Sequence, residues 1–553
     1  MRRVVVVGNG MVGSRFASDL VARLSDDEAG AAEITVLGAE EYEPYNRVLL
    51  SEVVAGKVEL AAIGLPGADD ERVAVRRGTE AIAIDRSSRR VITADGAYPY
   101  DAVVLATGAA ARVPDIRGIT DRAGGFPRGV HALRTLDDAR GIVAAAANAR
   151  HAVVIGAGVL GLEVACGLAH RGVPVSVVHG GASPMDRQLD TDAGRVVEAS
   201  LARLGVRTWT RARTERVRVD QHGRACGVEV HTPDDPTAGT RVVDVGADLV
   251  VLACGTVPET GLARAARLRV DRGVVVGEDL ASPDDPRVFA IGDCAQPPEG
   301  GTGLIAQGWD QSRRLAEALA AVARPDEGAT AGRLSGRPAS AGDADRPSMA
   351  LRLATSAVVR PHDPQPGGAA GNPRVTGTDV VRVKAAGLEI VTMGASGREP
   401  GHRSLTLSDP ASGRYVRVVV ADGFLVGATC VGAPDVGADL TATYTRRVPV
   451  PADPAHLLLR PVAPAPVQAA TPTHMPDRTT VCHCNGVTKG DLVACWHDGA
   501  RSADELARGT RATTGCGGCR DVVCGIADWL AAADPSEDVM PGSPALSPSP
   551  QRS

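Results

Sequence analysis

The stretch Val4-Val-Val-Val-Gly8-Asn-Gly10-Met-Val-Gly13 is a β-branched run that ends in three glycines. A helical pattern follows, and Ile34-Thr-Val-Leu37 is a second apolar run. A strand, a glycine turn, a helix and a parallel strand together predict a dinucleotide site. Gly8 permits the tight turn, Gly10 lets the backbone approach a pyrophosphate, and Gly13 lets the helix pack on the strand.

A dinucleotide site of this kind needs an acidic residue for the ribose hydroxyls near the end of the second strand. Glu40 is the best candidate, and Glu41 and Glu43 compete with it. The helix that follows the glycine turn offers unpaired amides and the positive end of its dipole to the phosphates.

The same pattern returns after His151, where an apolar run leads into Gly156-Ala-Gly158-Val-Leu-Gly161 and a second helix. The strand Val175–Val178 completes this second unit. One such motif arises easily by chance, but two complete units predict two nucleotide sites in an α/β protein. The alternative is a pair of glycine turns in an Ala- and Gly-rich protein.

Two more strands end in small polar motifs, Ala-Thr107-Gly108 and Gly292-Asp293. With them, residues 1 to about 320 resemble the two-dinucleotide-binding flavoprotein reductases. The resemblance implies FAD at the first glycine motif, NADH or NADPH at the second, and Asp293 on the ribityl chain of the flavin. It also implies that the nicotinamide domain is inserted into the FAD domain.

Three further residues are weaker candidates for cofactor contacts. Glu163, on the second fingerprint helix, is a candidate for the nicotinamide or for the helix dipole. Arg47 is a candidate for the flavin, with a solvated arginine as the alternative. His179 replaces the usual acid at the end of the strand Val175–Val178, with Arg187 nearby, and we therefore expect NADPH to be rejected less strongly than in the family.

Four cysteines lie near the other end of the chain, in TVCHCNG (Cys482, Cys484) and TTGCGGC (Cys516, Cys519). Four thiolates fit a structural zinc site or a [2Fe-2S] cluster. The glycines around the second pair favour the cluster because they let backbone amides approach the sulfurs. The module resembles the bacterioferritin-associated ferredoxin-like [2Fe-2S] domain, which has this spacing.

The remaining cysteines favour no disulfide chemistry. Cys495 and Cys524 fall in predicted helices and are expected to pack, and the other five are scattered singly. Because no Cys-x-x-Cys pair lies near the flavin motif, a thioredoxin-reductase mechanism is close to excluded.

Composition and patterning predict eight segments. The expected segments are an FAD domain in two parts (1–112 and 249–323), an NAD(P)H domain (113–248), a flexible Gly/Pro-rich insertion (324–374), a small α/β domain (375–448), a Pro-rich linker (449–476), the helical cluster module (477–533) and a disordered tail (534–553).

The formal net charge of −6 with interspersed signs gives no surface for nucleic acid, and no apolar run is long enough to span a membrane. We expect a cytoplasmic protein, with a homodimer as one option for its assembly.

The whole order of segments resembles the N-terminal part of the large subunit of assimilatory NAD(P)H nitrite reductase, supported by VVVVGNGMVG, PYNRVLLSE and TVCHCNGVTKG. Those subunits continue into a sirohaem and [4Fe-4S] domain. No second cysteine group with ligand spacing is found here, so we expect the chain to deliver electrons without reducing nitrite. The resemblance implies an electron-transfer subunit whose partner is a molybdenum-containing nitrate reductase subunit or a sirohaem nitrite reductase. The alternatives are a ferredoxin or rubredoxin reductase and, in another class, a redox-sensing interaction protein.

Overall fold

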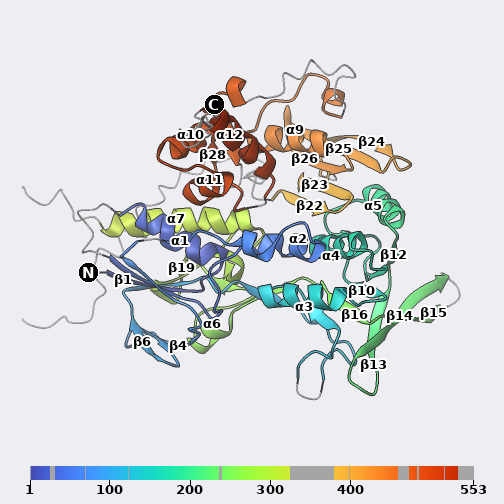
Figure 1. The fold of residues 1–553 in the computed structure, drawn as a ribbon, viewed down its shortest axis with the longest axis horizontal. Coiled ribbons are helices and arrows are strands. Elements are labelled where there is room, and N and C mark those ends of the chain that lie inside the picture. Colours follow the sequence, from blue (N-terminus) through green and yellow to red (C-terminus); the bar gives the residue numbers. More distant parts are fainter. Residues whose placement is uncertain are drawn as a thin grey trace, which may run out of the picture. The chain divides into compact units, whose positions relative to one another are not determined.

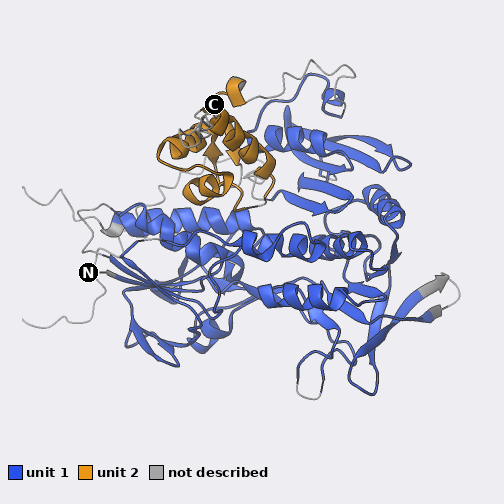
Figure 2. Cartoon of the chain, in the orientation of Figure 1, with its two compact units in different colours: residues 1–462 blue, residues 463–553 orange. Residues whose placement is uncertain are grey.

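The computed structural model describes residues 2–24, 32–68, 70–121, 124–235, 239–323, 379–397, 399–458, 472–482, 485–515 and 517–533. They fall into two compact units, residues 1–462 and 463–553, which Figure 2 distinguishes by colour. The predicted insertion (324–374) and tail (534–553) lie outside the described residues, as do Cys484 and Cys516.

The first sheet of unit 1 is parallel apart from one short edge strand (Figure 1). Val4 to Val7 are all buried, as expected of a central parallel strand that is covered on both faces. In order across the sheet, the strands are β19 (Ala281–Ser282), β20 (Asp285–Ala290), β7 (Ala102–Leu105), β1 (Arg2–Val7), β2 (Ala32–Leu37) and β3 (Val73–Arg76).

The second sheet is wholly parallel and carries the second glycine motif. In order, its strands are β12 (Val206–Trp209), β11 (Val175–Val178), β10 (Ala152–Ile155), β16 (Leu249–Leu252) and β9 (Val130–Ala132). Since β16 pairs with β10, this sheet extends past the boundary at residue 248 that the sequence suggested.

Shorter antiparallel strands accompany the two sheets. They are β4 (Ala81–Asp85), β5 (Arg90–Thr93) and β6 (Gly96–Pro99) in one sheet, β13 (Arg213–Val219), β14 (Ala225–Asp235) and β15 (Gly239–Val245) in another, and β8 (Ala109–Ala111) with β17 (Thr256–Pro258) as a pair. A parallel pair joins β18 (Val274–Val275) to β21 (Ala295–Gln296).

Helices connect these strands. They are α1 (Met11–Val21), η2 (Arg47–Leu49), α2 (Leu50–Ala55), η3 (Leu60–Ile63), α3 (Leu136–Ala146), α4 (Val159–His170), α5 (Thr191–Arg203), α6 (Gly261–Ala265), η4 (Gly292–Cys294) and α7 (Ile305–Ala323).

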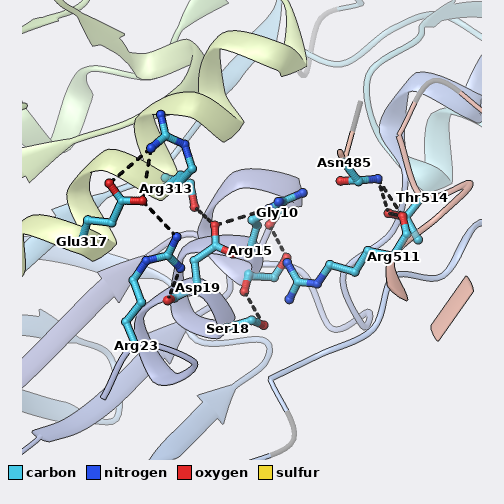
Figure 3. A network of polar contacts seen from close by, with 12 residues as sticks. Gly10, Arg15, Ser18, Asp19, Arg23, Arg313, Glu317, Asn485, Arg511 and Thr514 are labelled. Carbon is cyan, nitrogen blue, oxygen red and sulfur yellow. Dashed lines mark hydrogen bonds and ion pairs between the residues drawn. The ribbon is translucent and has the colours of Figure 1, made fainter. Parts of the chain in front are cut away.

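Polar contacts fix α7 against α1 (Figure 3). Asp19 of α1 accepts hydrogen bonds from Arg15 at 3.3 Å and from Ser312 of α7 at 2.8 Å. Arg23 of α1 pairs with Glu317 of α7 at 3.2 Å. These contacts join a helix near the start of the chain to one about 300 residues later, as an inserted domain requires.

The small domain is a five-stranded antiparallel sheet with one helix, α9 (Pro434–Thr445), packed on it. Its strands, in order, are β22 (Val381–Ala385), β23 (Leu388–Gly394), β26 (Phe424–Val431), β25 (Arg414–Ala421) and β24 (Arg403–Asp409). Asp190, the N-cap of α5, binds Tyr415 at 2.7 Å and Arg417 at 2.8 Å, which ties this sheet to the second domain. Leu458, next to η5 (Pro454–Leu457) and within the predicted linker, is buried in the core of the small domain.

Unit 2 is a small helical module. It contains η6 (Pro472–His474), the hairpin of β27 (Thr480–Cys482) and β28 (Val487–Thr488), and the helices α10 (Lys489–His497), α11 (Ala503–Thr510) and α12 (Arg520–Ala533). Cys482, Cys519 and Trp496 belong to its core. Among the helices of the described residues, none is long and apolar enough to cross a membrane.

Candidate functional site

The first glycine turn is shaped for a bound phosphate. Gly8 has a φ of 118°, and a Cβ there would overlap the carbonyl oxygen of Ala106, so a larger residue does not fit. A Cβ on Gly13 would overlap the carbonyl of Gly8, whereas the nearest atom to a Cβ on Gly10 would be Nε of Arg47, at 4.0 Å. Gly10 is the N-cap of α1 and has no side chain to satisfy the first amides, which stay available to an anion.

A second observation at this turn fits a bound dinucleotide. The side-chain amide nitrogen of Asn9, Nδ2, is buried and has no hydrogen-bond partner among the described residues. Asn9 lines a pocket together with Ser14, Glu43 and Pro44. A buried donor without a partner is costly, so a ligand that accepts from it would be favoured.

The predicted ribose-binding acid, Glu40, follows β2 and is held by two neighbours. Tyr45 donates to it at 2.7 Å, and the Arg47 guanidinium forms an ion pair with it. Arg47 also lies over the ring of Tyr45, and burial raises the pKa of that tyrosine. Of the competing acids, Glu43 pairs with Arg77 at the surface. Glu40 and Arg47, predicted separately, are thus in direct contact.

The two small polar motifs come together because β7 and β20 are adjacent parallel strands. Their carboxyl ends lie at one edge of the sheet, where ligands bind in open α/β folds. Gly108 and Gly292 both have positive φ, 71° and 75°. Thr107 donates to a backbone carbonyl at 2.8 Å, and Asp293 accepts from Arg134 at 2.7 Å.

Arg134 is a site residue that the sequence did not single out. Besides Asp293, it binds the carbonyl of Ala109 at 2.7 Å, and its own carbonyl accepts from Arg47 at 3.0 Å. It directly precedes the capping box of Thr135 and Asp138, which starts α3. The capping box is readable in the sequence, but its link to Asp293, 159 residues away, is not.

The second glycine turn repeats the first. Gly156 has a φ of 111°, and a Cβ there would overlap the carbonyl oxygen of Ala253. Gly161 packs against Gly156. Gly158 is the N-cap of α4, and a Cβ added to it would meet no atom within 4 Å. The open middle glycine and the uncapped helix start fit a second pyrophosphate.

Glu163 of α4 lies at a junction of three elements. Ser51 of α2 donates to its Oε2 at 2.7 Å, and the backbone N–H of Lys384 in β22 lies 3.4 Å from its Oε1. Burial raises the pKa of this carboxyl, and the Ser51 hydrogen bond opposes the rise. Its approach to a nicotinamide stays a prediction.

His179 follows β11 and faces the second glycine turn, with Nδ1 3.4 Å from the amide of Ala157. Its other ring nitrogen lies 3.3 Å from Oδ1 of Asp186. The loop after the strand therefore brings a carboxylate to the histidine that replaces the usual acid, and the expected weak rejection of NADPH stays a prediction. Arg187, the cation predicted nearby, is exposed.

The cysteine module brings Cys482 and Cys519 together although 36 residues separate them. The hydrogen bond from Cys519 lowers the pKa of the Cys482 thiol to about 6. The amide of Thr513 lies 3.2 Å from the Cys519 sulfur, and the Asn485 side chain lies 3.6 Å from the Cys482 sulfur. N–H donors directed at sulfur fit ligands of a redox cluster.

The loop around these sulfurs is itself fixed by Asn485. Its amide donates to the carbonyl of Arg511 at 2.6 Å and lies 3.2 Å from the hydroxyl of Thr514 (Figure 3). Arg511 and Thr513 both have positive φ, 63° and 66°. The other two predicted ligands, Cys484 and Cys516, lie outside the described residues.

Comparison with protein families agrees with this geometry. Residues 2–323 match the pyridine nucleotide-disulphide oxidoreductase family, and residues 480–528 match the BFD-like [2Fe-2S] binding domain. The first match confirms the prediction of FAD and a pyridine nucleotide, and the second confirms the [2Fe-2S] cluster over zinc.

Two curated relatives match almost the whole chain. The nitrite reductase [NAD(P)H] of Bacillus subtilis (strain 168) is 29% identical over 94% of this chain and 57% of that protein. The assimilatory nitrate reductase electron transfer subunit of the same organism is 28% identical over 94% of this chain and 59% of that protein. The chain therefore spans less than two thirds of the length of either relative.

A solved structure supports the fold. The chain in the crystal structure of the covalent putidaredoxin reductase–putidaredoxin complex aligns with a TM-score of 0.62 at 23% identity, over 82% of this chain and 95% of that one. The arrangement of two dinucleotide-binding domains predicted from the sequence is thus confirmed.

Proposed function

The chain belongs to the pyridine nucleotide-disulphide oxidoreductase family, and from this premise we propose that it oxidises NADH or NADPH and delivers the electrons to a separate protein of nitrate or nitrite assimilation. The observation that carries the proposal is the combination, in one chain, of two open glycine turns and a module whose cysteine sulfurs accept N–H hydrogen bonds.

Residues at the first turn would hold FAD. The amides at the start of α1 and the side chain of Asn9 would donate to its phosphates, and Glu40 would accept from the ribose. Asp293 would accept from the ribityl chain, and Arg134, 2.7 Å away, fixes the orientation of its carboxylate.

Residues at the second turn would hold the pyridine nucleotide. The amides at the start of α4 would receive its pyrophosphate, and the open space at Gly158 would let the phosphates approach the backbone. When bound, the flavin and the cluster supply the conversion of a two-electron donor into single-electron steps.

Cys482, Cys484, Cys516 and Cys519 would ligate the cluster. The N–H groups of Thr513 and Asn485 donate to the sulfurs of Cys519 and Cys482, so they would stabilise negative charge on those two ligands.

We favour a molybdenum-containing nitrate reductase subunit as the electron acceptor, since one relative is named as the electron transfer subunit of an assimilatory nitrate reductase. A sirohaem nitrite reductase is the second candidate, because a relative of nearly equal similarity is named as a nitrite reductase. We also propose a cytoplasmic location, which suits thiols that must stay reduced until they bind iron. We propose that the chain forms a homodimer, and analytical ultracentrifugation would measure its oligomeric state.

Anaerobically purified protein, loaded with FAD and iron, tests the proposal. NADH should reduce the flavin, and nitrate reduction should require both this chain and the added catalytic subunit. The chain alone should reduce neither nitrate nor nitrite. A matched assay with a nitrite reductase subunit separates the two acceptors.

Removing residues from Pro476 onward provides the control. The truncated protein should still bleach its flavin with NADH but should no longer support nitrate reduction. If the truncated protein still supported nitrate reduction at an undiminished rate, electrons would not pass through the cluster on their way to the catalytic subunit. Very slow NADH oxidation by the intact, fully loaded protein, even with an artificial one-electron acceptor, would favour a redox sensor instead.

A further inference from the structure

In many dinucleotide sites an acidic residue follows the second strand. Here His179 follows β11, and the carboxylate of Asp186 from the next loop is in contact with it. His179 Nε2 lies 3.3 Å from Asp186 Oδ1, and the opposite side of the ring faces the amide of Ala157. Ala157 stands between Gly156 and Gly158, the two glycines of the turn that would receive the pyrophosphate. The carboxylate is therefore next to the phosphate-binding turn, although it is seven residues from the strand end.

The loop that carries Asp186 is anchored on both sides. Met185 is buried in the core, and its amide donates to the carbonyl of Ala157 at 2.9 Å. Its φ of 52° is unusual for a residue with a side chain. Leu189 is also buried, and Asp190 caps α5 while it binds Tyr415. The position of Asp186 thus follows from contacts on either side of it.

Because Gly181 has no side chain, the carboxylate of Asp186 can occupy the space beside it. A Cβ on Gly181 would overlap Oδ2 of Asp186 and would stand 2.5 Å from Nε2 of His179. The backbone at Gly181 also accepts from the amide of Arg211 at 2.7 Å, so it cannot shift freely away. A glycine is needed here for the histidine and the carboxylate to meet.

We propose that Asp186, oriented by His179, is the carboxylate that binds the adenosine ribose of the pyridine nucleotide and disfavours a 2′-phosphate. The inference rests on the proposed use of NADH or NADPH. A carboxylate at this place accepts from the ribose hydroxyls of NADH and repels the extra phosphate of NADPH. His179 holds one oxygen, Oδ1, and the other, Oδ2, lies beside Gly181, so both neighbours fix the orientation of the carboxylate.

Two arginines set the surrounding charge. Arg187 follows Asp186 directly and is exposed, and Arg211 is exposed and lies near Glu198. Both would attract a 2′-phosphate once the carboxylate is removed. The chain therefore prefers NADH because of Asp186, a conclusion opposite to the weak discrimination that the strand end alone suggests.

Calorimetric binding of NAD+ and NADP+ to the FAD-loaded protein tests this assignment without turnover. The wild-type protein should bind NAD+ more tightly. Asp186→Asn should weaken NAD+ by at least about tenfold, as expected when a charged hydrogen-bond acceptor is lost, and should strengthen NADP+. Asp192→Asn is the matched control, because Asp192 is an exposed acid on the same domain that pairs with Arg195. It should leave both affinities unchanged.

Gly181→Ala separates geometry from charge. It keeps every charged group but pushes Asp186 and His179 apart, so it should weaken NAD+ in the same direction as Asp186→Asn. An unchanged ratio of the two affinities in Asp186→Asn, with wild-type binding intact, would overturn the assignment and leave the proposed function standing. Failure of the wild-type protein to bind either nucleotide would instead overturn the proposed function.

Discussion

Replacing Ser51 by alanine should destabilise unit 1, and the cost should depend on pH. Ser51 donates to Oε2 of Glu163 at 2.7 Å, and the carboxyl lies where α2, α4 and β22 meet. Burial raises the pKa of Glu163 above its ordinary value of 4.5, and the Ser51 hydrogen bond is the main contact that opposes this rise. Without Ser51, the charged carboxylate loses its strongest donor.

The magnitude follows from the charge of the acceptor. A hydrogen bond to a charged group contributes about 1.5–3 kcal/mol, and one between neutral groups about 0.5–1.5 kcal/mol. Ser51→Ala should therefore cost about 2 kcal/mol at pH 8 and about 1 kcal/mol at pH 5, where the carboxyl is more often protonated.

The sign of the pH dependence is fixed by the raised pKa. A group whose pKa is higher in the folded state than in the unfolded state stabilises the fold below its unfolded value. That contribution is lost as the pH rises from 4.5 through the raised value. Glu163→Gln stays neutral at every pH, so its stability relative to the wild type should increase as the pH rises.

Thermal unfolding of the wild type, Ser51→Ala, Glu163→Gln and the double variant between pH 5 and 8 makes a double-mutant cycle. The coupling between the two positions should be largest at pH 8. Ser18→Ala is the control, because Ser18 donates to the backbone carbonyl of Ser14 at 3.2 Å and involves no ionisable group. An equal cost of Ser51→Ala at all pH values would refute the reasoning.

Three further outcomes are expected. The purified chain should carry about one FAD and one [2Fe-2S] cluster, and metal analysis that finds zinc without iron or acid-labile sulfide would contradict this. Cys482→Ser should remove iron and sulfide while NADH still reduces the flavin in stopped-flow measurements, whereas loss of both would link the cysteine to the fold of unit 1. Arg134→Ala should weaken FAD binding by about tenfold, because Asp293 loses its 2.7 Å partner, and Arg134→Lys should restore part of the affinity.

The two glycine turns could be predicted because their function is local. Gly8 and Gly156 need a positive φ and no Cβ, and both requirements act within a few residues of the chain. The continuous apolar runs beside them were readable as buried parallel strands for the same reason. Each of the two cysteine pairs, the second with glycines around Cys516, likewise lies within a short segment.

Contacts between segments far apart in the sequence could not be predicted, because no local motif marks them. Arg134 follows β9 of the second sheet and Asp293 follows β20 of the first, and nothing in either sequence neighbourhood marks their pairing. Glu163 is similar, since its partners Ser51 and Lys384 come from α2 and from a strand of another domain.

The motifs alone were enough to predict two nucleotides and a cluster, because each glycine motif places its backbone, and each cysteine pair its two ligands, within one short stretch. They did not indicate which carboxylate meets His179 beside the second glycine motif. Asp186 reaches His179 through a loop held by the buried Met185 and made possible by the missing side chain of Gly181. That contact follows from the packing of the folded domain, since the course of a loop depends on the core it packs against and not on its own residues alone.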